Sequence, residues 1–373
     1  MNYFPKNMMR SAADYLALIH ALPVTQPLRV MNVCGGHERS IAMAGLRRAL
    51  PQHIQLIAGP GCPVCVCPEE DIYLAIQLAV QAKVILLAFG DMLRVPVNVS
   101  KTENRSLEQA KAQGADVRPI ASPLEALTIA QQNPQRDVVF FAAGFETTMA
   151  PVAAMLLQGA PNNLSVLLSG RLTWPAVLLL LNSGESNLDA LIAPGHVATV
   201  MGSEQWQFVV AQHQLPVAVA GFSPQSLLAA CYSVIRQRLQ GKRFVDNCYP
   251  ELVRSDGNVM AQKCLSQAFS IVPGNWRGIG VIADSAYELV PAFDLHNARH
   301  RFADIELMNR KRAGAMPAGC DCARVVLGKI NPDQCALFGR SCLPASPVGP
   351  CMVSDEGACR IWWASGIRKH DHA

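Results

Sequence analysis

The chain has 373 residues, of which 50% are hydrophobic and 16% are charged, and its formal net charge is +4. This length and apolar content are enough for two or three domains with buried cores. The charge is small and no basic stripe interleaved with aromatic residues stands out, which argues against nucleic-acid binding. The longest purely aliphatic stretch, residues 176–181, is far too short to cross a membrane.

Cysteine is frequent, with 13 residues in the chain. The mildly apolar N-terminus contains Asp14 and His20, and no convincing signal-peptide cleavage site follows. Disulfide frameworks are typical of small secreted domains, whereas cysteines in a cytosolic chain more often bind metals or take part in redox chemistry. We therefore expect a cytoplasmic protein with a thiol-based centre.

Residues 1–26 are predicted to form a helical arm, because apolar side chains recur at roughly helical spacing until Pro23 and Pro27 end it. Two series of four strand candidates follow, separated by helical segments. The first series covers residues 28–33, 54–58, 83–89 and 117–121, and the second covers residues 137–142, 164–168, 188–193 and 216–220. Alternating strands and helices are typical of α/β units with a parallel sheet.

The two series resemble each other, with an offset of roughly a hundred residues, about one domain. Ser122 and Pro123 close the first series, and Ser223 and Pro224 close the second. We therefore predict two similar Rossmann-like lobes with parallel sheets that face each other across a cleft. The lobes are expected at residues 27–136 and 137–255.

Residues 256–373 are predicted to form a third, smaller domain, on which the arm of residues 1–26 packs. The region is rich in loops, glycine and proline, and it carries Cys320, Cys322, Cys335, Cys342, Cys351 and Cys359. Thin apolar content suggests a metal that holds it together. An iron–sulfur cluster takes four thiolates, and so does a structural zinc ion. The irregular spacing leaves both open, together with a purely structural set of thiols.

Thiols also follow the first two strand candidates. The CGGH motif of residues 34–37 comes after residues 28–33, and the GPGCPVC motif of residues 59–65 comes after residues 54–58. Ligands of open parallel sheets bind outside the carboxyl ends of the strands. We therefore expect Cys34, Cys62 and Cys65 to share one crevice. The C-x-x-C spacing suits dithiol–disulfide exchange and suits metal binding equally well.

Three further side chains at strand ends are candidates for chemistry. His37 is a proton donor or a hydrogen-bonding partner of a ligand, and the alternative is a helix cap. Asp91 and Glu146 are acid/base or positioning groups, and the alternatives are a helix cap for Asp91 and an arginine partner for Glu146. The single cysteines at positions 231, 248 and 264 are predicted to fill the core. No P-loop and no G-x-G-x-x-G follows a strand, so nucleotide binding is not supported.

Together these motifs resemble the HypD family of [NiFe]-hydrogenase maturation factors. The resemblance runs nearly from end to end. It includes FGD at 89–91, RVP at 94–96, GFETT at 144–148, PGHV at 194–197, WRG at 276–278, CALFG at 335–339 and SDEGAC at 354–359.

The resemblance implies two α/β domains and a third domain with a [4Fe–4S] cluster. The four cysteines that best match the family's cluster pattern are Cys322, Cys335, Cys342 and Cys359. Cys320 and Cys351 look like less constant extras. By the same match, Cys34 is the ligand of an iron under assembly, Cys62 and Cys65 are a redox thiol pair, and His37 lies near that iron.

The family's role implies a redox-active assembly scaffold rather than a conventional turnover enzyme. With the small chaperone HypC it would build an Fe(CN)2CO unit for delivery to the hydrogenase large subunit. Cyanide would arrive from HypE, itself loaded by HypF. Low-spin iron with these ligands favours a soft thiolate anchor. The alternatives are a freestanding iron–sulfur thiol–disulfide oxidoreductase and a zinc-stapled binding protein.

Five positions depart from the family's pattern: Glu38, Arg39, Val97, Arg171 and Ser223. They cluster around the expected cleft and its rim, and they leave the thiol motifs intact. This pattern is compatible with a divergent paralogue that serves one particular hydrogenase.

Overall fold

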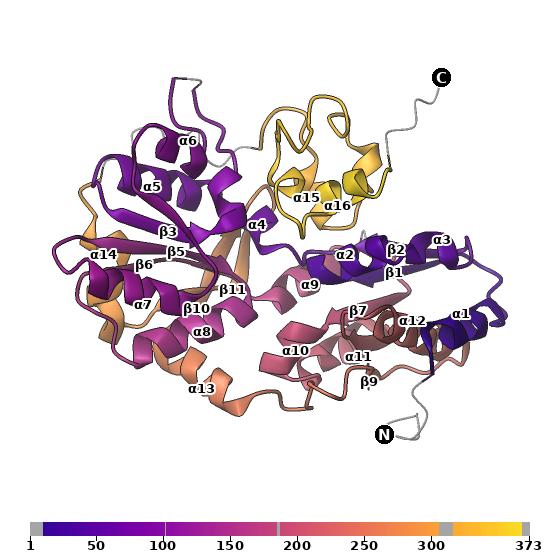
Figure 1. Cartoon of the computed structure of the whole chain (residues 1–373). Coiled ribbons are helices and arrows are strands. Elements are labelled where there is room, and N and C mark those ends of the chain that lie inside the picture. Colours follow the sequence, from indigo (N-terminus) through magenta and orange to yellow (C-terminus); the bar gives the residue numbers. More distant parts are fainter. Residues whose placement is uncertain (1–9, 101, 185–186, 306–315, 368–373) are drawn as a thin grey trace.

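The computed structural model describes residues 10–100, 102–184, 187–305 and 316–367. Within these ranges the strands form a five-stranded and a four-stranded sheet, both parallel, and one antiparallel hairpin (Figure 1). The predicted α/β class with two parallel-sheet lobes is confirmed. None of the described helices is both long and apolar enough to span a lipid bilayer.

The five-stranded sheet, sheet A, has the strand order β2-β1-β7-β8-β9. Its strands are β1 (Leu28–Asn32), β2 (Ile54–Ala58), β7 (Ala190–Pro194), β8 (Val217–Ala220) and β9 (Val245–Asn247). One face is covered by α1 (Ala12–His20), α2 (Gly35–Met43), α3 (Leu46–Ala49) and α12 (Pro224–Leu239). The other face is covered by α9 (Thr173–Asn182), α10 (Gly195–Met201), η2 (Glu204–Trp206) and α11 (Gln207–His213).

The four-stranded sheet, sheet B, has the strand order β4-β3-β5-β6. Its strands are β3 (Ile85–Phe89), β4 (Val117–Ile120), β5 (Val138–Gly144) and β6 (Leu164–Gly170). One face packs on α7 (Pro123–Gln132), α8 (Glu146–Leu157), α13 (Val259–Ala268) and the hairpin of β10 (Phe269–Trp276) and β11 (Gly280–Leu289). The other packs on α5 (Glu69–Val80) and α6 (Leu107–Ala112). Burial on both faces explains why the strands are continuous apolar runs.

The sheets do not follow the predicted division into residues 27–136 and 137–255. The chain begins sheet A with β1 and β2, builds all of sheet B, and returns to sheet A with β7. Each predicted series therefore gives two strands to each sheet. Apolar runs reveal that a strand exists, but its partner is chosen by long-range packing that the runs do not encode.

The order of strands places one reversal point in each sheet. Counted along the chain, sheet A has the order 2-1-3-4-5 and sheet B has the order 2-1-3-4. Doubly wound sheets bind ligands at the carboxyl ends of the strands where this order reverses. These points lie between β1 and β7 in sheet A and between β3 and β5 in sheet B.

The repeated Ser-Pro dipeptides are helix starts. The hydroxyl of Ser122 accepts from the backbone N–H of Leu124 at the start of α7, and the hydroxyl of Ser223 accepts from Ser226 at the start of α12. Proline follows each cap at the first helical position. Serine caps and proline at this position both favour a helix start, so the repeat marks equivalent turns.

The region after residue 255 is divided between two places, contrary to the prediction of one third domain. α13, β10 and β11 pack on the lobe of sheet B, followed by η3 (Pro291–His296) and α14 (Ala298–Arg301). Residues 316–367, which we call the cysteine-rich region, lie above α2 and α4 (Pro63–Val66) between the lobes (Figure 1). The region contains α15 (Cys322–Val326), η4 (Pro332–Gln334), η5 (Pro350–Met352) and α16 (Ala358–Ala364).

The N-terminal arm packs on sheet A and not, as predicted, on the third region. Tyr15 and Ile19 of α1 are buried, and the ring of Tyr15 lies 6.2 Å from that of Tyr232 in α12. The described part of the arm, from residue 10, thus covers an apolar face of α12; the part before it lies outside the described residues.

We expect Ile19→Ala to lower the free energy of unfolding by about 3 kcal/mol, because Ile19 is completely buried between α1 and α12. Denaturant unfolding followed by circular dichroism measures the change. The control Ala17→Ser alters an exposed position of the same helix and should change stability by less than about 0.5 kcal/mol. Equal effects of both variants would contradict this packing.

Candidate functional site

The loops after β1 and β2 touch through their backbones. Cys34 is the residue directly before α2, and the N–H of Gly35 donates to the carbonyl of Gly61 at 3.0 Å. A Cβ on Gly61 would lie 2.4 Å from the Cα of Cys34, closer than side-chain atoms approach. Only glycine at position 61 permits this approach. The two thiol-bearing strand ends therefore meet, as the sequence predicted.

Cys62 and Cys65 are joined by a disulfide, with their Cα atoms 5.3 Å apart. Cys62 directly precedes the single helical turn α4, and Cys65 is the third residue of that turn. The Sγ of Cys62 also accepts from the backbone N–H of Cys65 at 3.2 Å. Of the two uses that the C-x-x-C spacing allows, this structure shows the disulfide.

Cys34, Cys62 and Cys65 line one small cavity. Its opposite wall comes from the cysteine-rich region and includes Cys351 and Glu356. The cavity thus lies where the ends of β1 and β2 meet the cysteine-rich region. Burial, followed by the nearby charge of Glu356, raises the pKa of Cys34 to about 12, so this thiol is protonated at neutral pH.

The six thiols of the cysteine-rich region gather in one place. Cys322 interacts with Cys320, Cys351 and Cys359 through side-chain hydrogen bonds. A Cβ on Gly349 would lie 2.5 Å from the sulfurs of both Cys320 and Cys322. The charges of Cys335 and Cys342 bear on Cys359 as well. The two cysteines set aside as extras are therefore members of the same group.

This group fits a soft metal centre by the chemistry of its donors. All six donors are sulfur, which suits an iron–sulfur cluster or zinc better than a hard cation. The thiols are packed against each other, and no three His, Cys, Asp or Glu side chains in the described part of the chain are arranged to hold a metal ion. The six cysteines are enough to supply the four thiolates of such a centre, and two further thiols remain.

His37 lies behind Cys34, with its ring buried against β8. Its Nε2 lies 3.0 Å from the carbonyl oxygen of Ala220, and its ring centroid lies 4.9 Å from that of Phe222. Burial lowers the pKa of His37 to about 4, so the ring is neutral and Nε2–H is the donor. His37 does not cap α2, because Cys34 occupies that position. Its backbone N–H instead faces the Cys34 thiol.

Asp91 and Glu146 are not among the residues that line the thiol cavity. Asp91 accepts hydrogen bonds from Ser354 Oγ at 2.9 Å and from the backbone N–H of Asp355 at 3.2 Å, and so holds the cysteine-rich region. Glu146 accepts from the backbone N–H and the hydroxyl of Thr173, both at 2.8 Å. The alternative expectation for Glu146, an arginine partner, is wrong, since both of its oxygens bind Thr173 at the start of α9. Burial raises the pKa of Glu146.

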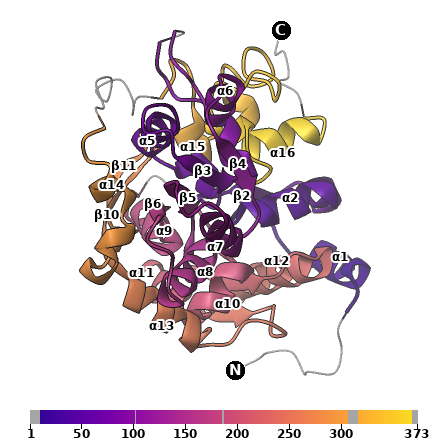
Figure 2. The ribbon, with the colours of Figure 1, turned by 60° about the vertical axis from the view of Figure 1, so that its left-hand side comes forward.

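Sequence reasoning missed the residue that fastens α2 to the cysteine-rich region. The buried Glu38 accepts from Arg47 at 2.7 Å and from the indole N–H of Trp362 in α16 at 2.7 Å. Figure 2 shows α16 beside α2. Glu38 had been noticed only as a departure from the family's pattern. The sequence shows only an acidic residue in a helix, with many basic and aromatic residues elsewhere in the chain. No spacing in the sequence pairs Glu38 with Arg47 or Trp362.

The other departures that the structure describes also make structural contacts. Arg171 is buried and donates to the carbonyl oxygens of Asn275 and Gly170. Val97 is buried, and its N–H donates to the carbonyl of Arg105. Ser223 caps α12. Arg39 is exposed, and its charge opposes the rise that burial and the charge of Asp91 cause in the pKa of Glu356.

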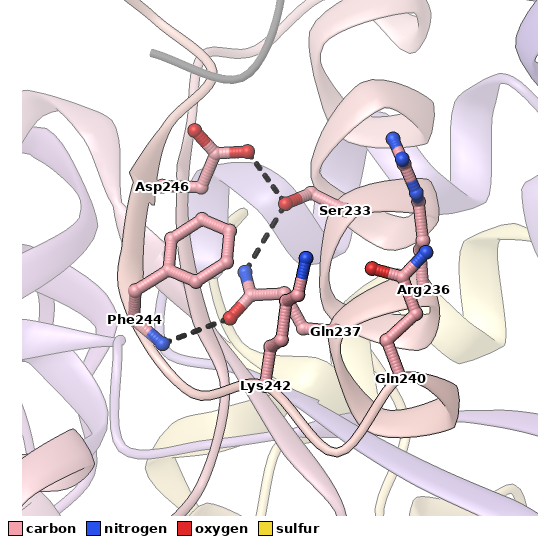
Figure 3. A pocket seen from close by; sticks show the side chains of 7 residues that line it. All are labelled: Ser233, Arg236, Gln237, Gln240, Lys242, Phe244 and Asp246. Carbon is pink, nitrogen blue, oxygen red and sulfur yellow. Dashed lines mark hydrogen bonds between the residues drawn. The ribbon is translucent and has the colours of Figure 1, made fainter. Parts of the chain in front are cut away.

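Cysteines 231, 248 and 264 pack among apolar side chains of the two lobes, as predicted. A separate hollow lies between α12 and β9 and is lined by seven residues, all labelled in Figure 3. Asp246 accepts from Ser233 at 2.6 Å, and Gln237 links Ser233 to the backbone N–H of Phe244. These bonds tie β9 to α12, so we interpret this hollow as structural.

The stability of the protein should fall on acidification because of His37. Its pKa is about 4 in the folded state and about 6.5 when exposed, so the unfolded state binds the proton more tightly. The neutral ring contributes fully above pH 6.5, and about 3 kcal/mol is lost as the pH falls through 4. Denaturant midpoints between pH 4 and 7 should show a shallower pH dependence in His37→Gln than in the wild type. The control His53→Gln should retain the wild-type slope; an unchanged slope in His37→Gln would refute the assignment.

Comparison with known proteins agrees with this arrangement of motifs. A family model described as "HypD: Hydrogenase formation hypA family" matches residues 10–366. The chain is 40% identical to the Hydrogenase maturation factor HypD2 of Bradyrhizobium diazoefficiens over 93% of this chain and 91% of that protein. It is 41% identical to the Hydrogenase maturation factor HypD of Azotobacter vinelandii over 91% of this chain and 90% of that protein. It is 39% identical to the protein of the same name in Escherichia coli K12, over 91% and 89% of the two chains. The chain therefore belongs to the HypD family.

Proposed function

We propose that this chain acts in hydrogenase maturation, as a redox-active scaffold on which the Fe(CN)2CO unit is assembled. Its relatives are named hydrogenase maturation factors, and they match it along nine-tenths of their length. The observation that carries the proposal is the shared cavity, in which Cys34 lies beside the Cys62–Cys65 disulfide and opposite the cysteine-rich region.

Cys34 is suited to anchor the iron under assembly. Cys34 lines the cavity, and the backbone N–H groups of Gly36 and His37 face its sulfur. A soft thiolate is the donor that low-spin iron with cyanide and CO prefers. Since the pKa of Cys34 is raised to about 12, binding of iron must displace one proton from this thiol.

The Cys62/Cys65 pair can supply electrons for cyanide attachment. Cyanide carried as a protein thiocyanate is released when its S–C bond breaks with the uptake of two electrons, which gives a thiolate and cyanide. A dithiol that closes to the observed disulfide yields two electrons and two protons. The stoichiometry therefore matches one cyanide for each oxidation of the pair.

Cys322, Cys335, Cys342 and Cys359 are the proposed ligands of a [4Fe–4S] cluster, and all four are buried. A cluster bound by these thiolates would supply single electrons, which is the chemistry needed to reduce the disulfide. Asp91 and Glu38 position this region over the cavity by their bonds to Asp355 and Trp362.

The proposed partners follow from the family. The chain works with a HypC-type chaperone, receives cyanide from HypE after loading by HypF, and serves the hydrogenase large subunit. Glu146 and His37 are proposed as groups that position the site, because their polar atoms bind protein groups.

We expect Cys34→Ala to abolish the infrared bands of CO and CN⁻ in protein purified without oxygen together with its chaperone, because the thiolate anchor is lost. Cys264→Ala removes a single, half-buried cysteine of α13 and should leave the bands unchanged. Bands that persist in Cys34→Ala would overturn the role of this residue.

The disulfide also favours a second candidate function, a freestanding thiol–disulfide oxidoreductase. This function predicts disulfide reductase turnover that needs Cys62 and Cys65 but survives Cys34→Ala. A maturation scaffold predicts loss of the infrared bands in all three single variants. Turnover without any CO or CN⁻ bands would therefore select the second function.

Removal of a proposed cluster ligand should remove the metal. We expect Cys335→Ala to lose most of its iron and its visible cluster absorbance, because each of the four thiolates would bind one iron of the cluster. Cys231→Ala removes an equally buried thiol from α12 and should keep both signals. Metal analysis that finds zinc and no iron would replace the cluster by a structural zinc site.

A further inference from the structure

Arg277 is a completely buried cation between the thiol cavity and the cysteine-rich region. Its guanidinium has a side-chain exposure of 0%, and its Nη2 lies 3.2 Å from the carboxylate of Glu69 and 2.7 Å from the carbonyl oxygen of Pro96. Its backbone N–H donates to the carbonyl of Val66 at 3.0 Å. Val66 is the residue that follows Cys65, so Arg277 is fixed directly to the turn that carries the disulfide.

The turn that contains Arg277 also touches the start of the cysteine-rich region. A Cβ on Gly278 would lie 2.7 Å from the Met316 side chain and 3.0 Å from Ala323, the residue after Cys322. Gly278 also has a φ of +72°, a backbone conformation that favours glycine. Glycine therefore suits position 278 both for this conformation and for the close approach. Arg277 is thereby held between two sulfur-bearing segments.

Most of the hydrogen-bonding capacity of Arg277 is unused. A guanidinium has five N–H donors, and Nη2 uses its two on Glu69 and Pro96. Nε and Nη1 are buried and have no hydrogen-bond partner among the described residues. Buried charged donors are costly unless they are paired, so an anionic group is expected beside them.

We propose that Arg277 sets the reduction potential of the metal centre that is bound by thiolates in the cysteine-rich region. Its Nε–H and Nη1–H groups stabilise the negative charge of that centre. The inference rests on the proposed cluster. Net charge, hydrogen bonds to sulfur and burial are the factors that tune such potentials. Reduction adds one electron to a buried anionic group, and a fixed cation favours the reduced state. Arg277 is a positioning residue for electron transfer to the disulfide.

The test is a potentiometric titration of the cluster in the full-length protein, followed by visible absorbance. Arg277→Gln should lower the potential by about 59 mV or more, a tenfold change in the equilibrium of a one-electron couple. Arg277→Lys keeps the charge but loses the fork of donors, so it should recover part of the shift. Arg171→Gln is the matched control, since Arg171 is also buried but its Nε, Nη1 and Nη2 all donate to carbonyl oxygens. It should leave the potential unchanged.

A second variant decides the question if Arg277→Gln fails to fold. Glu69→Gln removes the negative partner of Arg277 while the guanidinium stays, so the potential should rise. An unchanged or lower potential in Glu69→Gln, or an unchanged potential in a folded Arg277→Gln that retains its iron, would overturn the inference and leave the proposed function intact. Wild-type protein that contains no iron–sulfur cluster would overturn both.

Discussion

The backbone contact between Gly61 and Cys34 is the constraint on which the thiol site depends. With a Cβ excluded at position 61, the loop after β2 lies directly against Cys34, the residue that caps the start of α2. This contact brings Cys34 and the Cys62–Cys65 disulfide to one cavity. Both loops begin at adjacent parallel strands, so the sheet places them next to each other. Glycine at position 61 then allows their backbones to touch. This contact therefore provides the geometry for chemistry that needs a metal-binding thiol beside a two-electron thiol pair.

The cysteine-rich region is bound to both lobes by unlike interactions. Asp91 and Arg94, which follow a strand of sheet B, hold the backbone around Val353 and Asp355. Glu38, which follows a strand of sheet A, holds Trp362. The region therefore closes over the carboxyl ends of both sheets, where doubly wound folds bind their ligands. Cys351 lines the cavity together with Cys34, Cys62 and Cys65, and it also hydrogen-bonds to Cys322 and Cys359. It therefore connects the thiols of the cysteine-rich region to those at the ends of β1 and β2.

The sequence allowed the strands, the Ser-Pro helix starts and the meeting of Cys34 with the C-x-x-C turn to be predicted, because each depends on local pattern or on adjacent strands. The partition of strands between sheets was predicted wrongly, since β7 is 132 residues beyond β2 when counted from Ala58 to Ala190 and its pairing with β1 is a matter of packing. The contacts of Glu38 with Trp362 and of Arg277 with Glu69 join positions far apart in the chain. Such pairs have no spacing rule, and only the folded structure reveals them.

The route of the chain through the two sheets has a consequence for how the protein is made. All strands of sheet B lie within residues 85–170. Strands β1 and β2 are synthesised earlier, but sheet A cannot form until β7, its central strand, is available. During synthesis the N-terminal portion emerges first, and domains tend to fold as their residues become available. Sheet B can thus form on the ribosome before Cys34, Cys62 and Cys65 are held by a complete sheet A. The six thiols of residues 320–359 are synthesised after the strands of both sheets, so the group that they form is completed last.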